Sequence, residues 1–206
     1  MTIDLFGSDS FAQSARLDLP GADINLRSDF LSRAESDRLF ATLLAETEWQ
    51  EKNVFVWGKW HPQPRLVAWH GDADASYSYS GSTLVPSPWT AALSHIRQLA
   101  EDATQARFNS VLLNLYRDQN DRVGWHSDNE PELGPTPTIA SVSLGETREL
   151  LFKHRVEKLG THKIPLTHGS LLVMSGDTQR NWLHAINKES RPTGKRINLT
   201  FRQIRC

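Results

Sequence analysis

Cysteine is almost absent from this chain of 206 residues, since Cys206 is the only one. A disulfide framework and any zinc site built from cysteine pairs are therefore excluded, and so few thiols are typical of a reducing compartment. No apolar run approaches the ~18 residues that a membrane-spanning helix needs. Residues 1–20 are acidic and contain a single arginine, which is not the composition of a signal or transit peptide. We therefore expect an intracellular protein without a membrane segment, in the cytoplasm of a bacterium rather than in a nucleus.

An excess of charge of either sign is also missing, because the net charge is −1. The two parts of the chain nevertheless differ strongly. Residues 1–150 hold 12 basic and 21 acidic side chains, a balance of −9, whereas residues 151–206 hold 11 basic and 3 acidic ones, a balance of +8. Local patches rather than the total decide what a surface attracts. The near-neutral total therefore does not exclude a nucleic-acid partner.

Repeats and low-complexity segments are absent as well, and a mass of 23.3 kDa suits one domain. Residues 1–25 lack periodic apolar positions, so we expect a loosely ordered arm there and a single domain over residues 26–206. Helices are predicted after the capping box that begins at Ser32 and after Ser87-Pro88. The clearest strands are 54–57, 66–69, 111–116, 138–143, 149–153, 170–174 and 196–204. Helices followed by strands predict an α+β fold with the helices outside an antiparallel sandwich or barrel.

The segment His126-Ser127-Asp128 places an imidazole and a carboxylate two residues apart, so both point to one face of an extended chain. Two histidines and one carboxylate form the facial triad of non-haem Fe(II) oxygenases, which leaves coordination positions open. A second H-x-D begins at His70, but it lies in a stretch rich in glycine and aspartate that predicts a turn. His126 and Asp128, by contrast, follow a short apolar strand, residues 123–125. We therefore assign His126 and Asp128 to the metal.

The third ligand has to be chosen from the remaining histidines near the carboxyl end: His154, His162, His168 and His184. His154 and His162 lie in a basic stretch that is typical of an exposed surface, and His168 precedes a turn. His184 belongs to the apolar segment 182–186, shortly before the strand that begins at Arg196. We choose His184.

Two predicted strands each carry polar side chains on one face. Asn114 and Tyr116 share a face of the first strand, and the alternating positions of the second are Arg196, Asn198, Thr200 and Arg202. Polar groups inside a sheet need partners. The second row suits either the wet face of an edge strand or the binding of a small dicarboxylate, because an arginine binds a carboxylate through two hydrogen bonds and the amide and hydroxyl add more.

Together these residues resemble the AlkB-type Fe(II)/2-oxoglutarate-dependent dioxygenases, which repair alkylated nucleic-acid bases. The resemblance rests on H-x-D, the later histidine and the run R-x-N-x-T-x-R, extends over residues 55–202, and is strongest to the animal homologues that act on DNA. It implies a double-stranded β-helix (jelly-roll) core with flanking N-terminal helices and a nucleotide-recognition region over residues 50–85. It implies Fe(II) on His126, Asp128 and His184.

The resemblance also assigns the co-substrate, 2-oxoglutarate. It implies that Arg196, with Asn198 and Tyr116, holds the distal carboxylate. It places Asn114 and Arg202 near the end of 2-oxoglutarate that chelates iron, and Thr200 belongs to the same row.

The implied reaction is oxidative demethylation of N-alkylated bases such as 1-methyladenine and 3-methylcytosine in DNA, with release of succinate, carbon dioxide and formaldehyde. One alternative is the same cofactor chemistry on RNA or protein, and another is a non-catalytic nucleic-acid-binding module, for which the metal and arginine residues would be unnecessary. Ser127 stands where the branch that acts on duplex DNA commonly has arginine, so single-stranded DNA, duplex DNA and RNA all stay open. We expect a monomer.

A base inside a duplex has to be flipped out to reach such a site. Tyr77 and Tyr79, two residues apart, can present their rings to one face for stacking. Glu130 matches an acidic position near the flipped base, where a carboxylate suits a cationic methylated base. Trp57 at a predicted hairpin tip is either a wedge that fills the gap or a core residue. The basic positions predicted to follow the phosphates are Lys153, Arg155, Lys158 and Lys163.

Overall fold

The computed structural model describes residues 14–56, 58–75, 77–79 and 82–205; within these, the side chains of residues 55–56, 77–79 and 82–84 are left aside. The larger sheet consists of β1 (Ser14–Leu17), β2 (Asp23–Arg27), β3 (Gln50–Val56), β4 (Lys59–Gly71), β7 (Ser110–Tyr116), β9 (Ile139–Gly145), β12 (Ser170–Ser175) and β14 (Arg196–Arg202). The smaller sheet consists of β8 (Val123–His126), β10 (Arg148–His154), β11 (Thr161–Leu166) and β13 (Trp182–Ile186). A separate hairpin joins β5 (Tyr77–Tyr79) to β6 (Ser82–Leu84), and the helices are α1 (Arg33–Glu46), α2 (Ala91–Thr104), the 3-10 turn η1 (Pro131–Leu133) and α3 (Thr178–Asn181).

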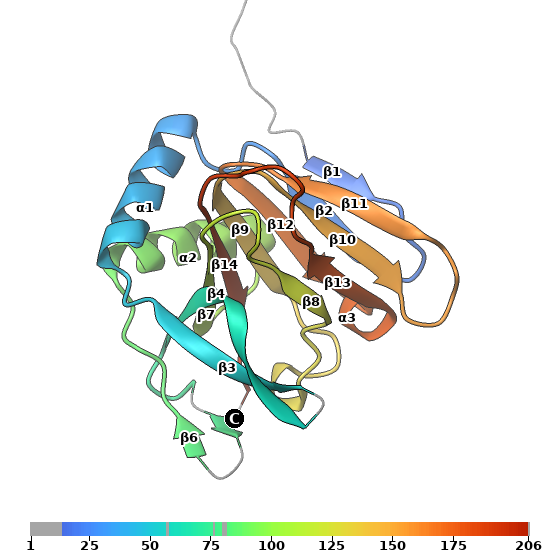
Figure 1. Ribbon diagram of the computed structural model, residues 1–206, viewed down its shortest axis with the longest axis horizontal. Helices are drawn as coiled ribbons and strands as arrows, with labels where there is room; N and C mark the ends of the chain where they lie inside the picture. The colour runs from blue at the N-terminus through green and yellow to red at the C-terminus, as the bar shows by residue number, and fades with distance from the viewer. Residues whose placement is uncertain (1–13, 57, 76, 80–81, 206) are drawn as a thin grey trace, which may run out of the picture.

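The two main sheets lie face to face, and α1 and α2 cover the outer face of the larger one (Figure 1). The larger sheet has the order β1-β2-β12-β9-β14-β7-β4-β3 and the smaller one β11-β10-β13-β8, with every pairing antiparallel. This arrangement confirms the predicted α+β fold with a jelly-roll core and helices outside it. None of the described helices is long and apolar enough to cross a membrane.

Strand alternation divides the core into two layers, since successive side chains on a strand point to opposite faces. Leu113 of β7 and Leu199 of β14 pack outward against helix residues such as Leu39 and Ile96. The layer between the sheets is built mainly from Ile139, Phe152, Ile164, Leu172, Met174 and Trp182. The polar side chains of β7 and β14 share this inner side, so the fold directs them into the space between the sheets.

The two long helices, α1 and α2, have N-caps, but α2 begins later than predicted. Ser32 accepts a hydrogen bond from the backbone of Glu35 at the start of α1, as the capping box predicts. The start of α2 is capped by Thr90, not by Ser87, because Ser87 forms a backbone bridge with β4 at His70. Ser87-Pro88 therefore ends an extended segment, and the helix follows three residues later.

The predicted loose arm over residues 1–25 is wrong for its described part. β2 pairs with β12 over five residues, and Ile24 is fully buried between the sheets. The backbone oxygen of Pro20 accepts a hydrogen bond of 3.0 Å from the indole of Trp182. Backbone pairing and one buried isoleucine hold this segment, which is why apolar periodicity did not reveal it.

Candidate active site

Three side chains with metal-binding atoms meet between the sheets, close to the open edge of β8. β8 and β13 are neighbours, and His126 is directly opposite His184 in their register. Asp128 lies two residues beyond the end of β8. The ligand atoms of the three residues all lie within 4.8 Å of one another. The structure therefore brings together the three residues that the sequence assigns to the metal, although 58 residues separate the two histidines.

Both imidazoles are in a state that suits a metal. The Nδ1 of His126 lies 2.8 Å from the carbonyl oxygen of Gly124, so it donates there and leaves Nε2 with a free lone pair. His184 is buried, and its Nδ1 has no hydrogen-bond partner in the described part of the chain. Burial, with a smaller contribution from His126, lowers the pKa of His184 to about 3. A neutral imidazole is the form that binds a metal.

Asp128 supplies the one carboxylate of the group. Only 3% of the residue is exposed, and its Oδ1 accepts a hydrogen bond of 2.6 Å from Nη2 of Arg202. Burial alone would raise the pKa of Asp128, but the charges of Arg202, His184 and His126 and the hydrogen bond from Arg202 together outweigh burial and keep this pKa below its usual value. The carboxylate is therefore ionised, and it is oriented by one oxygen while the second stays available to a cation.

The polar row of β14 is buried in the middle of the larger sheet, so it is not the wet face of an edge strand. β14 pairs with β7 on one side and with β9 on the other, and Arg196 lies opposite Tyr116. Arg196 is 1% exposed, and its guanidinium carbon lies 5.1 Å from the ring centre of Tyr116. Its Nη2 donates to Ser143 at 2.9 Å, whereas Nε and Nη1 have no partner among the residues described. A buried cation with two unused donors suits an anionic ligand.

The other members of the row differ in how much capacity they keep. Both amide hydrogens of Asn198 are directed at protein oxygens, the hydroxyl of Ser141 at 2.8 Å and the carbonyl of Val142 at 3.2 Å. Thr200 donates to the amide oxygen of Asn198 at 3.0 Å. These bonds hold the row within the sheet, so the direct contacts of Asn198 and Thr200 with a co-substrate stay predictions.

Several residues at the site were not singled out from the sequence. Ser143 and Ser141 of β9 hold Arg196 and Asn198, and the alternation of serine in residues 140–143 was the available signal. Arg65 of β4 donates to the amide oxygen of Asn114 at 2.7 Å. Nothing local to Arg65 marks it, because its place follows from the pairing of β4 with β7.

A cavity of about 810 Å³ has Arg202, the hydrogen-bond partner of Asp128, in its wall. Trp69 and Leu112 contribute apolar surface, and the exposed Glu130 contributes a carboxylate. Glu130 therefore shares a cavity wall with Arg202, and its role as a substrate residue stays a prediction.

The aromatic residues predicted to meet the base are less fully described. Trp57 lies outside the described residues. Tyr77 and Tyr79 belong to β5, whose backbone pairs with β6, and their side chains are among those left aside. Figure 1 places the β5–β6 hairpin below β3, at the end of the molecule that β3 and β4 reach.

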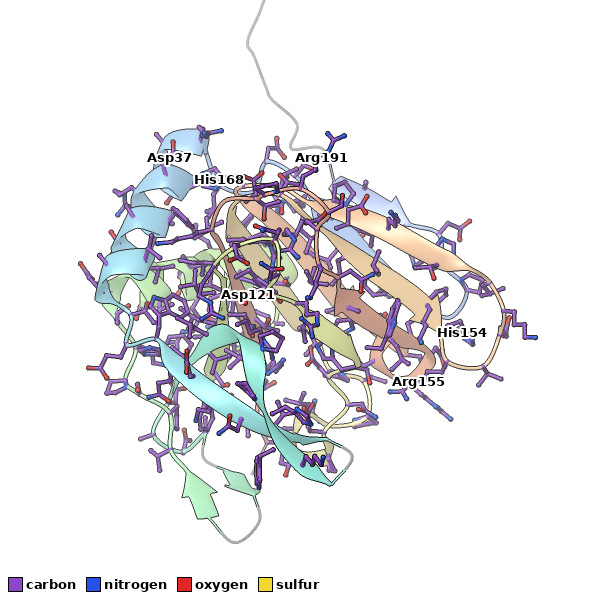
Figure 2. The ribbon with its side chains drawn as sticks, viewed as in Figure 1. Asp37, Asp121, His154, Arg155, His168 and Arg191 are labelled. Carbon is purple, nitrogen blue, oxygen red and sulfur yellow. The ribbon has the colours of Figure 1, made fainter. Side chains whose placement is uncertain are left out.

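The rejected histidines have other partners. His168 receives the backbone N–H of Gly145 and lies 3.1 Å from Asp37 of α1, and Figure 2 shows these two side chains together beside that helix. The rings of His154 and His162 pack edge-on against Trp182, with centroid distances of 5.1 and 5.6 Å. The second H-x-D is also engaged, since His70 bonds the Pro88 carbonyl and Asp72 accepts from Trp89 and Arg97.

The basic stretch after residue 150 reaches the metal-binding group on one side. Arg155, at the end of β10 in Figure 2, donates a hydrogen bond to the hydroxyl of Ser127, which stands between two of the three metal-binding residues. Lys153 lies 4.4 Å from the ring of Trp125. Lys163 is instead paired with Glu149 at 2.9 Å, which neutralises it. The predicted basic track is therefore uneven, and its cations nearest the site are Lys153 and Arg155.

A jelly roll that holds two histidines and one aspartate, next to a buried arginine with unused donors, defines the class of non-haem Fe(II) oxygenases. The family model described as the 2OG-Fe(II) oxygenase superfamily matches residues 23–202. The chain therefore belongs to this superfamily, whose members use Fe(II) and 2-oxoglutarate, and its resemblance to the AlkB type is confirmed by the relatives that follow.

Two curated relatives illustrate the similarity. The human DNA oxidative demethylase ALKBH2 is 40% identical over 182 residues, which cover 84% of this chain and 70% of the human protein. The mouse alpha-ketoglutarate-dependent dioxygenase alkB homolog 3 is 41% identical over 184 residues, which cover 85% of this chain and 64% of the mouse protein. The solved structure of OsALKBH1 has a TM-score of 0.64 at 17% identity, covers 93% of this chain and 100% of its own, and shows the shared fold.

Proposed function

We propose that this protein repairs DNA by oxidative demethylation of N-alkylated bases such as 1-methyladenine and 3-methylcytosine, with Fe(II), 2-oxoglutarate and dioxygen. The observation that carries the proposal is the group His126, Asp128 and His184, which Arg202 links to a cavity that Glu130 lines, together with the buried guanidinium of Arg196 and its unused donors. The names of the relatives, which include DNA oxidative demethylases, support DNA as the substrate.

The residues present fit the metal. Two imidazoles and one carboxylate are the donor set of a facial Fe(II) site, and the unpartnered Nδ1 of His184 means that this ring is not committed to a protein acceptor. We propose that His126, Asp128 and His184 hold the iron. When bound, Fe(II) with 2-oxoglutarate and dioxygen supplies the oxidation of the alkyl carbon, which leaves the base as formaldehyde while succinate and carbon dioxide are released. Arg202 keeps the carboxylate of Asp128 ionised and oriented in this role.

The co-substrate fits the polar row of β14. We propose that Arg196 binds the distal carboxylate of 2-oxoglutarate through the two donors that the protein leaves unused, with Tyr116 beside it. Asn198 and Thr200 keep the strand in place through their bonds within the sheet. Burial strengthens the attraction between the guanidinium and a carboxylate, because little water competes with it.

The cavity has the properties that a flipped, methylated base requires. Trp69 and Leu112 supply apolar contact area, and the carboxylate of Glu130 favours a base that carries a positive charge, as 1-methyladenine and 3-methylcytosine do. The chain segment over residues 50–85 contributes much of the lining through β3 and β4, and we propose it as the nucleotide-recognition region.

The test of this function is formaldehyde release from three methylated oligomers: single-stranded DNA, duplex DNA and RNA. We expect release from DNA that requires both Fe(II) and 2-oxoglutarate and yields one succinate per formaldehyde. Unmethylated oligomers of the same sequence are the control. Release from RNA alone, or from no nucleic acid, would contradict the proposal and favour the same chemistry on another substrate.

The basic residues beside the site give a second expected result. Lys153→Ala should raise the KM for a methylated oligonucleotide several-fold and reduce the slope of log affinity against log salt by about 0.7–0.9, the loss of one phosphate contact. The matched control is Lys163→Ala on the neighbouring strand, because its ammonium is already neutralised by Glu149. Equal effects of the two substitutions in a titration series at rising salt would argue against a phosphate contact at Lys153.

A further inference from the structure

The backbone of Asp128 has no partner in the sheets. β8 ends at His126, so the N–H of Asp128 lies beyond the last hydrogen bond of the β8–β13 ladder. The residue is nevertheless 3% exposed, so water cannot serve this N–H easily. A buried N–H group needs an acceptor, and in this position the acceptor has to come from a side chain.

Gln179 provides that acceptor. Its Oε1 receives the N–H of Asp128 at 2.9 Å, across 51 residues of chain, and the glutamine is 1% exposed. Only the oxygen of an amide can accept, so the orientation of the side chain is determined by this bond. The amide nitrogen then faces the sulfur of Met174 at 3.4 Å, a weak acceptor that does not compete for the oxygen.

The short helix that carries Gln179 is itself firmly held. Thr178 accepts the backbone N–H of Asp23 at 2.8 Å and donates to Ser175 at 2.6 Å, and Asn181 donates to the carbonyl of Gly21 at 2.9 Å. α3 leads directly into β13, which carries His184. One anchored turn therefore supports two of the three metal-binding residues, one along the chain and one through the side chain of Gln179.

We propose that Gln179 is a positioning residue of the metal centre, which holds the backbone of Asp128 so that its carboxylate stays directed at the site shared with His126 and His184. Arg202 restrains only the carboxylate, at Oδ1, and leaves the backbone that carries it free to shift. Partners that orient metal ligands in this way commonly affect metal affinity by 10- to 100-fold. The inference rests on the proposed function, because it takes this group to be the metal site.

The test measures metal binding rather than turnover. Gln179→Met keeps the volume but removes the acceptor, and Gln179→Asn keeps an amide that is one methylene too short to reach. Both should weaken Co(II) binding by about tenfold or more, measured by visible absorption on the metal-free protein, and should broaden the Co(II) spectrum. The matched control is Thr178→Val in the same helix, which loses hydrogen bonds to Asp23 and Ser175 but none to Asp128. It should lower Tm but weaken Co(II) binding less than either Gln179 variant does, because the bond from Gln179 to Asp128 remains.

Two variants of Gln179 are used so that the test can still be read if one of them fails to fold. Wild-type Co(II) affinity in a folded variant would overturn the inference, and so would an equal loss of affinity in Thr178→Val, since a loosened helix would then be the cause. Wild-type protein that binds Co(II) but releases no formaldehyde from any methylated nucleic acid would instead overturn the proposed function alone. Tm of each metal-free variant shows whether it is folded.

Discussion

Replacing His126 by alanine should reduce 2-oxoglutarate-dependent formaldehyde release to background while leaving the fold intact. The imidazole is half-buried, and its hydrogen bond to Gly124 is local, so little of the core depends on it. Loss of one of three protein donors removes the site's capacity to hold Fe(II) in a facial geometry. The measurement is formaldehyde release together with Co(II) titration. His95→Ala on α2, where the ring bonds only Glu35 in the described structure, is the control for a generic loss of histidine.

Asp128→Ala should abolish turnover equally but at a cost in stability that His126→Ala does not have. Removing the carboxylate leaves Arg202 without its acceptor, and breaking a buried ion pair costs about 3–5 kcal/mol, with the lower end expected here because Arg202 keeps 18% exposure. Asp128→Asn keeps the acceptor oxygen and should restore much of the lost Tm without restoring turnover. Retained formaldehyde release in the variants of His126 or Asp128 would refute the assignment of these residues as metal ligands.

Arg196→Met should abolish useful affinity for 2-oxoglutarate at only a modest cost in the stability of the free protein. Truncating one partner of a buried charge pair costs about 2–5 kcal/mol of binding, which corresponds to roughly 30-fold to several thousand-fold in affinity. Nε and Nη1 have no hydrogen-bond partner among the described residues, so the ligand-free protein loses mainly the bond from Nη2 to Ser143. The measurements are 2-oxoglutarate binding by calorimetry and the rise of Tm that 2-oxoglutarate causes in the wild-type protein.

Arg148 offers the matched control for Arg196. It is also fully buried and lies against the same ring, 5.6 Å from the centre of Tyr116. Its donors, however, are used by protein acceptors: the carbonyls of Asp118, Asp121 and Asn187 and the carboxylate of Glu189. Arg148→Met should therefore lower Tm strongly, because it leaves buried acceptors unpaired. A larger drop in Tm for Arg196→Met than for Arg148→Met would contradict the role of Arg196 as a ligand-binding residue.

The two arginines show what could be read from the sequence and what could not. Both lie on β-strands, and neither looks unusual alone. Arg196 was singled out because it opens an alternating row with Asn198, Thr200 and Arg202, a pattern visible within seven residues. Arg148 has no such row, and its role follows from two loops that the fold brings over it.

The N-terminal segment shows the same limit of prediction from local sequence. Its acidic, serine-rich composition predicts an arm, yet β2 joins the larger sheet and helps to anchor α3. Hydrogen bonds between backbones carry little trace of residue type, so composition alone did not reveal the strand.

The fold class and most of the candidate ligands can be predicted from the sequence, because strand alternation and H-x-D are patterns of neighbouring residues. Two-residue periodicity sets which side chains share a face, whatever the position of the strand in the sheet. The partners that those faces meet depend instead on how the sheets are assembled. The pairing of His126 with His184 and the bond from Asp128 to Gln179 each join segments more than 50 residues apart. The unused donors of Arg196 reflect the lack of such a contact among the described residues. Such contacts depend on strand order and register, which no local pattern encodes.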